Sequence, residues 1–413
     1  MHPGFRDQEI VLGVTGSIAA YKACELASRL KEAGAKVLPV LTRGGAEFVG
    51  AAALEGVTGR PVIRHMFDPA QNPEIEHIAV ARRAALFLIA PASANILAKA
   101  AHGIADDWLT TTLLATRAPV LFAPAMNTQM YLHPATQANI ALLQSRGARF
   151  VGPGEGNLAC GEVGPGRLID TPAILEAALC ALSTDRSLAG RRVLITSGAN
   201  HEPIDPVRFI GNRSSGKMGR AIVLEALRRG AEVTVVTGPH EAPLPHAAQV
   251  VRVDTAAQMH EAVEARFDAC DIFIAAAAVA DYRVESPETD KRKRQDSVYT
   301  LTLVPNADIA AAMGVRKRPG QIAVGFAAET RDFVAHAQDK LARKKLDLIC
   351  ANEVGTTDSG FGTDTHRAWL LTPGAEPLEC GLIGKDDLAA RIFDAIAPRL
   401  SAAGDAPAQT RLA

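Results

Sequence analysis

The sequence lacks paired cysteines, long apolar runs and a charge excess, the features that mark secreted, membrane and nucleic-acid-binding proteins. None of its six cysteines forms a C-x-x-C pair, which argues against a disulfide framework or a zinc site and indicates a reducing compartment. The formal net charge is −1, so we expect neither nucleic acid nor a membrane as a partner. No apolar run is long enough to span a bilayer. The apolar start at 10–20 is broken by Gly13 and Gly16, so it predicts a strand and turn rather than a signal peptide, and we expect a cytoplasmic protein.

The chain is too long for one ordinary hydrophobic core. Its 413 residues are 48% hydrophobic and 22% charged, which is typical of globular proteins and favours two domains. A small, polar segment without periodicity at 183–190 follows a helical pattern and precedes a strand pattern, as a domain junction does. We therefore predict a first domain at 1–182, a linker at 183–190, a second domain at 191–400 and a disordered tail at 401–413.

The first half opens with a strand–helix–strand pattern. A buried strand at 10–14 leads into Thr15-Gly16-Ser17, a helical pattern at 18–33 and a second strand at 36–41. The small-residue turn can place a phosphate at the helix N-terminus, where unpaired N–H groups carry partial positive charge. The G-x-G-x-x-G pattern of dinucleotide sites is absent, which favours a mononucleotide.

Two later strands also end in polar residues. The strand at 86–90 runs into Ser93 and Asn95, and the strand at 120–123 runs into Asn127. Carboxyl ends of parallel strands meet at one crevice of an open α/β sheet, so these side chains are candidate ligand contacts. Taken alone, a buried Ser or Asn is more often a satisfied structural group than a ligand.

Two further residues of the first half have reactive side chains. His77 stands at the start of a predicted helix and is either an exposed polar residue or a proton-exchanging group. The segment at 152–167 holds six Gly and two Pro, which we interpret as excluding helix and regular strand. It is a predicted mobile loop that carries Cys160, and such a loop can expose a reactive thiol.

In this order, these segments resemble the flavin-dependent cysteine decarboxylases, specifically the phosphopantothenoylcysteine decarboxylase family, over residues 8–180. That family has the motifs P-x-M-N-x-x-M-W and G-x-x-x-C-G-x-x-G-x-G-[RK], and this chain departs from them at Tyr131, where Trp is usual. The resemblance implies that His77 acts in oxidation and decarboxylation, that Asn127 holds the substrate carboxylate and amide, and that Cys160 donates a proton in the reductive step. It also implies FMN as cofactor, bound by Thr15, Gly16, Ser17, Thr42, Ser93 and Asn95.

The second half is organised around DPVRFIGNRSSGKMGR at 205–220. Its Gly211–Lys217 portion fits the G-x-x-x-x-G-K start of a P-loop, but Met218 replaces the hydroxyl residue that holds Mg²⁺. Pro203 and Pro206 also separate it from the preceding strand. A phosphate site at the following helix, a true P-loop and an ordinary capped helix start all remain open from the residues alone.

Later segments of the second half add charged and polar groups. Asp281 follows the strand at 271–275 and is either a helix cap or a ligand for a nucleotide or metal. The basic run at 290–294 is either solvated surface or a lid over a triphosphate. Lys340 and Lys344 are spaced to share one helix face.

Together with GFAAET at 325–330, these segments resemble the phosphopantothenate–cysteine ligase domain over residues 190–395. The chain departs from that family at 198–201, where Gly-Ala-Asn-His replaces Gly-Gly-Thr-Arg, and in the basic run. The resemblance implies that Lys291 assists the first half-reaction, that Asn212 handles an acyl-cytidylate, and that Asp281 is a candidate Mg²⁺ contact. It implies CTP and acyl-cytidylate contacts at Arg208, Ala278, Asp281, Lys291, Pro305, Asn306, Ala307, Asp308, Phe326, Lys340 and Lys344.

The two resemblances predict an α/β protein with two doubly wound, Rossmann-like parallel-sheet domains in tandem. They imply coenzyme A biosynthesis: CTP-dependent ligation of 4′-phosphopantothenate to cysteine, then FMN-dependent decarboxylation to 4′-phosphopantetheine. Family members assemble as dodecamers of trimers with dimeric ligase domains, which implies a homo-oligomer. The alternatives are a flavin-binding regulatory protein on the same scaffold that lacks activity, and an unrelated P-loop NTPase.

Overall fold

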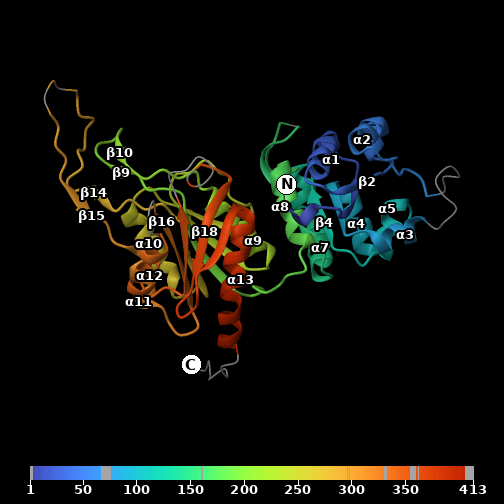
Figure 1. Cartoon of the computed structure of the whole chain (residues 1–413). Helices are drawn as coiled ribbons and strands as arrows, with labels where there is room; N and C mark the ends of the chain where they lie inside the picture. The colour runs from blue at the N-terminus through green and yellow to red at the C-terminus, as the bar shows by residue number, and fades with distance from the viewer. Residues whose placement is uncertain are drawn as a thin grey trace, which may run out of the picture. The chain divides into compact units, whose positions relative to one another are not determined.

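The computed structural model describes residues 3–66, 76–159, 161–294, 296, 298–329, 333–353, 360 and 362–404. Contacts within the chain divide it into two compact units, Met1–Thr184 and Asp185–Ala413 (Figure 1). Leu188 lies in the segment expected to be a linker, yet it is buried in the core of the second unit. No helix in the described part of the chain is long and apolar enough to cross a membrane.

The first unit is built on a five-stranded parallel sheet in the order β2-β1-β3-β4-β5. This 2-1-3-4-5 order is a doubly wound α/β arrangement, as predicted. β1 and β3 are buried along almost their whole length, because helices cover both faces of a parallel sheet. The strands are β1 (Glu9–Val14), β2 (Lys36–Leu41), β3 (Leu86–Ala92), β4 (Val120–Pro124) and β5 (Arg149–Phe150).

The helices of the first unit follow the strands and pack on the sheet around Phe87 and Phe122. The helix predicted at 18–33 begins as the 3-10 helix η2 and continues as α1. The helices are η1 (Pro3–Phe5), η2 (Ile18–Lys22), α1 (Ala23–Glu32), η3 (Gly45–Glu47), α2 (Ala51–Thr58), α3 (Glu76–Arg83), α4 (Ala94–His102), α5 (Trp108–Ala115), α6 (Thr128–Leu132), α7 (Pro134–Ser145) and α8 (Thr171–Leu182).

The glycine-rich segment at 152–167 contains an antiparallel pair of strands, β6 (Gly154–Asn157) and β7 (Val163–Arg167). The prediction that it holds no regular strand was wrong. Its glycines permit the pairing, since Gly156 and Gly166 have φ values of 135° and 138°, which other residues rarely adopt. Cys160 lies outside the described residues.

The second unit is built on an eight-stranded sheet in the order β12-β11-β8-β13-β16-β17-β18-β19. Its first six strands are parallel and follow the 3-2-1-4-5-6 order of Rossmann folds. β18 and β19 pair antiparallel, so the sheet is mixed. A short turn can join these two strands because they are antiparallel, whereas a parallel pair would need a crossover connection. The strands are β8 (Arg192–Ser197), β11 (Glu232–Thr237), β12 (Gln249–Arg252), β13 (Ile272–Ala275), β16 (Ile322–Glu329), β17 (Leu348–Glu353), β18 (Thr365–Leu371) and β19 (Leu378–Gly384).

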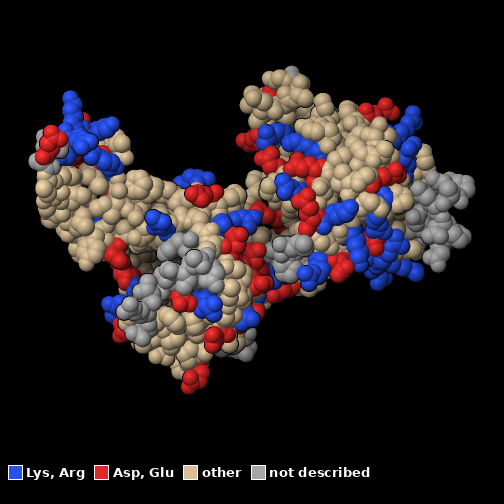
Figure 2. Space-filling model, turned by 45° about the horizontal axis from the view of Figure 1, so that its top comes forward, with Lys and Arg blue, Asp and Glu red and all other residues tan. Residues whose placement is uncertain are grey.

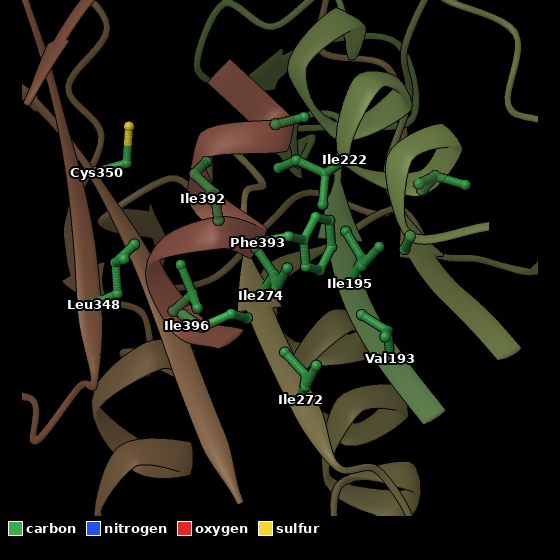
Figure 3. Close-up of a cluster of buried hydrophobic side chains, with 14 of the residues drawn as sticks. Val193, Ile195, Ile222, Ile272, Ile274, Leu348, Cys350, Ile392, Phe393 and Ile396 are labelled. Carbon is green, nitrogen blue, oxygen red and sulfur yellow. The ribbon is translucent and has the colours of Figure 1, made fainter. Parts of the chain in front are cut away.

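Helix α13 (Lys385–Gly404) closes one face of this sheet. Figure 3 shows Phe393 between the side chains of Ile195 and Ile274, with Ile396 beside them. Burying a side chain of this size contributes roughly 1.5–3 kcal/mol. The helix continues through Gly404, so the predicted disordered tail does not begin at 401, and 405–413 lie outside the described residues. The other helices are α9 (Lys217–Arg228), α10 (Ala256–Phe267), α11 (Ile309–Arg316) and α12 (Phe333–Arg343).

Two short antiparallel pairs stand apart from the main sheet of the second unit. The pair β9 (Glu202–Pro203) and β10 (Phe209–Ile210) lies between β8 and α9 along the chain. The pair β14 (Tyr282–Val284) and β15 (Leu303–Pro305) carries the segment at 285–302 away from the sheet (Figure 1). Because β14 starts directly after Asp281, the interpretation of Asp281 as a helix cap was wrong.

Candidate active sites

The first unit has a cavity of about 470 Å³ at the carboxyl ends of β1, β2 and β3. Five of the six predicted flavin-binding residues line it, and Ser17 is not among the described lining residues. The cavity therefore brings together strand ends that are distant in sequence. It is lined by Thr15, Gly16, Thr42, Arg43, Gly44, Glu47, Ser93, Ala94, Asn95, Ile96, Lys99, Asp107 and Met130.

Hydroxyl groups hold the walls of this first cavity in place. The buried Thr15 Oγ1 donates to the Pro91 carbonyl oxygen at 2.7 Å and accepts from the Ser93 N–H at 3.0 Å, which joins the turns after β1 and β3. Thr42 Oγ1 donates to the Val14 carbonyl oxygen at 3.2 Å. The predicted ligands thus also serve as the framework of the cavity, and each hydroxyl that lines it is already paired within the protein.

Two helix N-termini lie at these turns. Ser17 caps η2 by accepting from the Ala19 N–H, and Ser93 caps α4 by accepting from the Ile96 N–H. Gly16 allows the chain to pass close to the next turn, since a Cβ there would lie 3.2 Å from the Gly44 backbone. Small residues and exposed N–H groups at a helix N-terminus suit the phosphate of a mononucleotide.

Two predicted catalytic residues of the first unit lie away from this cavity in the described structure. Neither His77 nor Asn127 is among its described lining residues. His77 lies half-buried in the first turn of α3. Asn127 caps α6 by accepting from the Gln129 N–H at 2.8 Å, and its Nδ2 donates to Glu162 Oε2 at 2.7 Å. Glu162 was missed, although it stands two residues after Cys160.

The second unit has a smaller cavity, of about 130 Å³, along the carboxyl ends of β8, β13, β16 and β17. Of the predicted nucleotide-binding residues, its described lining includes only Ala278 and Phe326. The polar residues Asn352, His366 and Lys385 were missed. The cavity is lined by Ser197, Gly198, Ser214, Ser215, Gly216, Lys217, Met218, Gly219, Ala276, Ala277, Ala278, Phe326, Ala328, Asn352, Gly360, His366 and Lys385.

The glycine/serine turn at 211–217 opens onto α9, as predicted. Gly216 caps the helix with a φ of 74° and no side-chain hydrogen bond, so side chains leave the first N–H groups of α9 uncapped. A Cβ on Gly219 would lie 2.0 Å from Ser197 Oγ, which shows how closely the helix starts against β8. In a P-loop the turn leaves its strand directly. Here β9 and β10 separate β8 from α9, so the turn at 211–217 lacks this feature.

A second group of predicted residues meets just beyond β13. Asn212 Nδ2 donates to the Val279 carbonyl oxygen at 2.8 Å, and Asn306 Nδ2 donates to the Ala280 carbonyl oxygen at 2.9 Å. The Asn306 N–H also donates to the Asp281 carbonyl oxygen at 2.8 Å. These bonds gather Asn212, Ala278, Asp281 and Asn306 around one turn. The family resemblance had assigned all four to the nucleotide site.

Arg208 connects this region to the basic run. The buried Asp205 carboxylate accepts from the Arg208 Nε at 2.9 Å, and Arg208 Nη2 donates to the Arg292 carbonyl oxygen at 2.7 Å. Although burial raises the pKa of Asp205, hydrogen bonds from Val207 and Arg208 outweigh it and lower the pKa to about 2. Asp205 is therefore ionised at neutral pH and fixes the Arg208 guanidinium against the backbone of Arg292 in the basic run.

The basic run at 290–294 is partly neutralised within the arm that carries it. Arg292 Nη1 lies 2.6 Å from Glu288 Oε1, and its guanidinium lies 4.0 Å from the centre of the Tyr299 ring. Figure 2 shows basic and acidic side chains together at the end of this arm. Repulsion within the run therefore does not require a bound anion. Lys291 itself is exposed.

Two other predicted nucleotide contacts pair with each other. Lys344 Nζ lies 2.8 Å from Asp308 Oδ2, and Asp308 also caps α11. Burial raises the pKa of Asp308, but Lys344 and the Ala311 N–H together lower it. α12 ends at Arg343, yet the Lys344 N–H still donates to the Lys340 carbonyl oxygen, so the predicted helical spacing is kept. Pro305 ends β15, and Ala307 lies between Asn306 and Asp308.

The departure at 198–201 lies inside the fold. Asn200 is fully buried, and neither of its amide atoms has a hydrogen-bond partner among the residues that the structure describes. His201 stacks on Phe209 with ring centres 3.6 Å apart. These two side chains therefore lie in the turn that follows β8.

The described residues form no cluster of three or more His, Cys, Asp or Glu that would hold a metal ion. The Asp281 side chain is exposed at the turn beyond β13. Mg²⁺ that arrives with a nucleotide needs only one or two protein carboxylates, because phosphate oxygens and water supply the other ligands. A single carboxylate at Asp281 fits that mode and does not fit a permanent metal centre.

Both halves of the chain match known families. Residues 5–182 match the model described as "Flavoprotein", and residues 188–400 match the "DNA/pantothenate metabolism flavoprotein C-terminal domain". Three relatives carry the name "Coenzyme A biosynthesis bifunctional protein CoaBC". The protein from Vibrio vulnificus (strain YJ016) is 44% identical over 89% of this chain and 92% of its own. That from Escherichia coli (strain K12) is 43% identical over 90% and 93%.

The third, from Bacillus subtilis (strain 168), is 44% identical over 95% of this chain and 97% of its own. These matches run through both units and cover nearly the whole length of each relative. The chain belongs to the family of coenzyme A biosynthesis bifunctional proteins.

Proposed function

We propose that the chain carries out two consecutive steps of coenzyme A biosynthesis. The second unit joins 4′-phosphopantothenate to cysteine with CTP, and the first unit decarboxylates the product to 4′-phosphopantetheine. The observation that carries this proposal is the presence of two separate cavities, each at the carboxyl edge of its own doubly wound sheet. In open α/β sheets this edge is where ligands bind. Residues 183–190 join the two units, although Leu188 belongs to the second core.

In the first unit, the cavity around Thr15, Thr42 and Ser93 would hold FMN. When bound, FMN supplies a two-electron acceptor for the substrate thiol and later returns the electrons. Small residues and the N-termini of η2 and α4 provide N–H groups for its phosphate. Asn127, held by Glu162, would orient the substrate carboxylate, and His77 and Cys160 would move protons. These roles follow the resemblance described above.

In the second unit, the chemistry requires activation of a carboxylate. The pantothenate carboxylate attacks the α-phosphorus of CTP, pyrophosphate leaves, and an acyl-cytidylate forms. The amine of cysteine then attacks the acyl carbon and releases CMP. Lys291 and Mg²⁺ near Asp281 would offset the charge of the triphosphate in the first half-reaction. Asn212, at the turn beyond β13, would bind the acyl-cytidylate.

In the described part of one chain, the predicted catalytic residues do not gather at the first cavity, which supports a homo-oligomer. His77 and Asn127 are not among the described residues that line the cavity, and large apolar side chains are exposed near it. Tyr21 is 62% exposed and Ile18 59% exposed, beside the Thr15 turn. We propose a dodecamer built from decarboxylase trimers with paired ligase units, located in the cytoplasm.

One assay tests the proposed function. Purified protein is supplied with 4′-phosphopantothenate, cysteine, CTP and Mg²⁺, and the products are followed by mass spectrometry. We expect CMP, pyrophosphate and 4′-phosphopantetheine, and a yellow protein with the absorption spectrum of FMN. A yellow protein that releases no CMP when cysteine is added would instead support a flavin-binding regulatory protein. A colourless protein that ignores every nucleoside triphosphate would contradict both.

A further inference from the structure

Lys385 is a buried cation in the cavity of the second unit. It is the first residue of α13, it is 7% exposed, and its Nζ donates to the Thr363 carbonyl oxygen. It lines the cavity together with the first turn of α9, although the two helices are distant in sequence. The cavity therefore has a second positively charged wall besides the glycine/serine turn.

The protein does little to neutralise this cation. Within the described part of the chain, no carboxylate forms an ion pair with Lys385. The nearby Asp364 is already bound by Lys217, with Nζ 2.6 Å from Oδ1. A helix N-terminus also disfavours positive charge, because the helix dipole is positive there. A buried ammonium ion is normally paired, so the site is electrostatically incomplete without an anion.

Two uncharged polar groups of the same cavity also have no partner. Ser197 Oγ and His366 Nδ1 are buried without a hydrogen bond in the described structure, and the residues are 1% and 4% exposed. Burial, and then Lys385, lower the pKa of His366 to about 4. His366 is thus neutral at pH 7 and adds hydrogen-bonding capacity without more charge. Buried polar atoms without partners are rare in folded proteins and call for a ligand or water.

We propose that Lys385 binds a phosphate group of a substrate in this cavity, opposite the first turn of α9, with Ser197 and His366 as neutral hydrogen-bonding partners. The proposal deepens the proposed function, on which it rests. Two substrates of the second unit carry phosphate: the triphosphate of CTP and the monophosphate of 4′-phosphopantothenate. A phosphate would form an ion pair with Lys385 and accept hydrogen bonds from the uncapped N–H groups of α9. It would also give Ser197 Oγ and His366 Nδ1 a hydrogen-bonding partner.

Binding measurements on Lys385→Met test the proposal. The full chain is titrated calorimetrically with CTP and Mg²⁺, with 4′-phosphopantothenate, and with pantothenate, which lacks the phosphate. A hydrogen bond to a charged group contributes enough for removal of the ammonium to weaken one phosphate ligand by about 10- to 100-fold. The ligand that weakens identifies the phosphate that Lys385 holds. Lys385→Arg, which keeps the charge, should retain most of the affinity.

Lys317→Met is the matched control, because Lys317 is also largely buried but has a carboxylate partner. Its Nζ lies 2.5 Å from Asp347 Oδ2. We expect Lys317→Met to lower the melting temperature of the ligand-free protein and to leave phosphate affinity unchanged. Lys385→Met should do the reverse: lose phosphate affinity while the ligand-free protein melts no lower than the wild type.

Unchanged affinity of Lys385→Met for both phosphate ligands would overturn the inference, as would a lower melting temperature with normal affinity. If this variant does not fold, Ser197→Ala replaces it, since that change removes only an unpartnered hydroxyl. It should fold normally and bind the same ligand several-fold more weakly, and normal binding would again overturn the inference. If the wild type binds neither phosphate ligand, the proposed function itself fails, so the two failures are distinguishable.

Discussion

The two cavities occupy the same place in two related sheets, yet their polar groups are treated differently. In the first unit, Thr15 and Thr42 form hydrogen bonds that hold neighbouring turns together, and Ser93 caps α4. In the second unit, Ser197 Oγ and His366 Nδ1 have no described partner, and Lys385 has no described carboxylate partner. Each described hydroxyl that lines the first cavity is hydrogen-bonded within the protein, whereas the second cavity leaves polar groups without a partner in the described structure.

This difference matches two kinds of ligand. A cofactor that stays bound through many turnovers favours a rigid cradle whose shape the protein fixes itself. A substrate polyanion that enters and leaves in every cycle can be bound by charge that the empty protein leaves unneutralised. Because the unneutralised charge destabilises the empty site, its neutralisation by the ligand makes the free energy of binding more favourable. The contrast predicts that similar substitutions in the two cavities will have opposite effects.

The largest effect tests whether the two sites are chemically separate. His77→Asn removes the imidazole that we propose moves a proton in the first unit. Because general acid–base catalysis contributes up to about 10⁴-fold, we expect CO₂ release from phosphopantothenoylcysteine to fall by at least about 1,000-fold. CMP release by the second unit should be unchanged. Both rates are measured on one preparation by isotopic CO₂ capture and nucleotide chromatography.

Cys160→Ala is the companion variant, since it should still form the oxidised substrate while failing to complete turnover. Normal CO₂ release by His77→Asn would remove His77 from the mechanism. A loss of both activities would show that the two units do not act independently.

A smaller loss is expected from Lys291→Gln in the second unit. Lys291 is exposed on the arm next to the fixed Arg208, and we propose that it stabilises charge on the triphosphate. Removing such a group costs roughly 100- to 1,000-fold in rate. Quenched-flow measurement should show slower formation of the acyl-cytidylate. In Asn212→Asp the intermediate should form and persist, and its absence there would contradict the division of roles between the two residues.

The contrast also explains what could be predicted from the sequence. In the first unit every predicted strand formed. The ligand edge was evident because Thr15 and Ser93 directly follow buried parallel strands, and Asn127 stands three residues after another. In the second unit the family resemblance identified Ala278, and the strand-end rule could have identified Asn352, near the end of β17. Turn chemistry and strand ends are local features, so one sequence reveals them.

Lys385 and His366 could not be found in this way. His366 lies on β18, an antiparallel strand, and Lys385 starts a helix that follows a hairpin. Neither position has the strand-then-polar pattern of a parallel crossover, and only the fold brings them to the turn at 211–217. The β6–β7 pair was missed for the opposite reason, because its glycines were interpreted as breaking strands when their positive φ values permit this one.

A pH profile measures the charge of the second cavity directly. Burial, and then the neighbouring Lys217, lower the pKa of Lys385 to about 8, while Asp364 opposes this shift. A phosphate favours the protonated form, so its affinity should be complete below that pKa and decline as the pH rises through it. The protonated fraction falls from about nine-tenths at pH 7 to about one-tenth at pH 9, so we expect about tenfold weaker binding.

Lys385→Arg provides the control for this profile, because a guanidinium does not titrate in this range. Its affinity should stay nearly constant between pH 7 and 9. A tenfold decline in the Arg variant as well would contradict the assignment of this titration to Lys385.

The smallest effect compares the loss of one hydroxyl in each cavity. Thr15→Val removes the donor to Pro91 and the acceptor for the Ser93 N–H, so two buried backbone groups lose their partner. We expect about 1–3 kcal/mol of lost stability in the first unit and several-fold weaker FMN binding. Ser197→Ala removes a buried hydroxyl without a described partner, so the free energy of unfolding should stay the same or rise. Chemical denaturation of the ligand-free protein, followed by circular dichroism, and FMN titration, followed by flavin fluorescence, separate the two variants. Equal destabilisation by both would mean that Ser197 is satisfied as fully as Thr15, and the two cavities would then not differ in the way that their hydrogen bonds indicate.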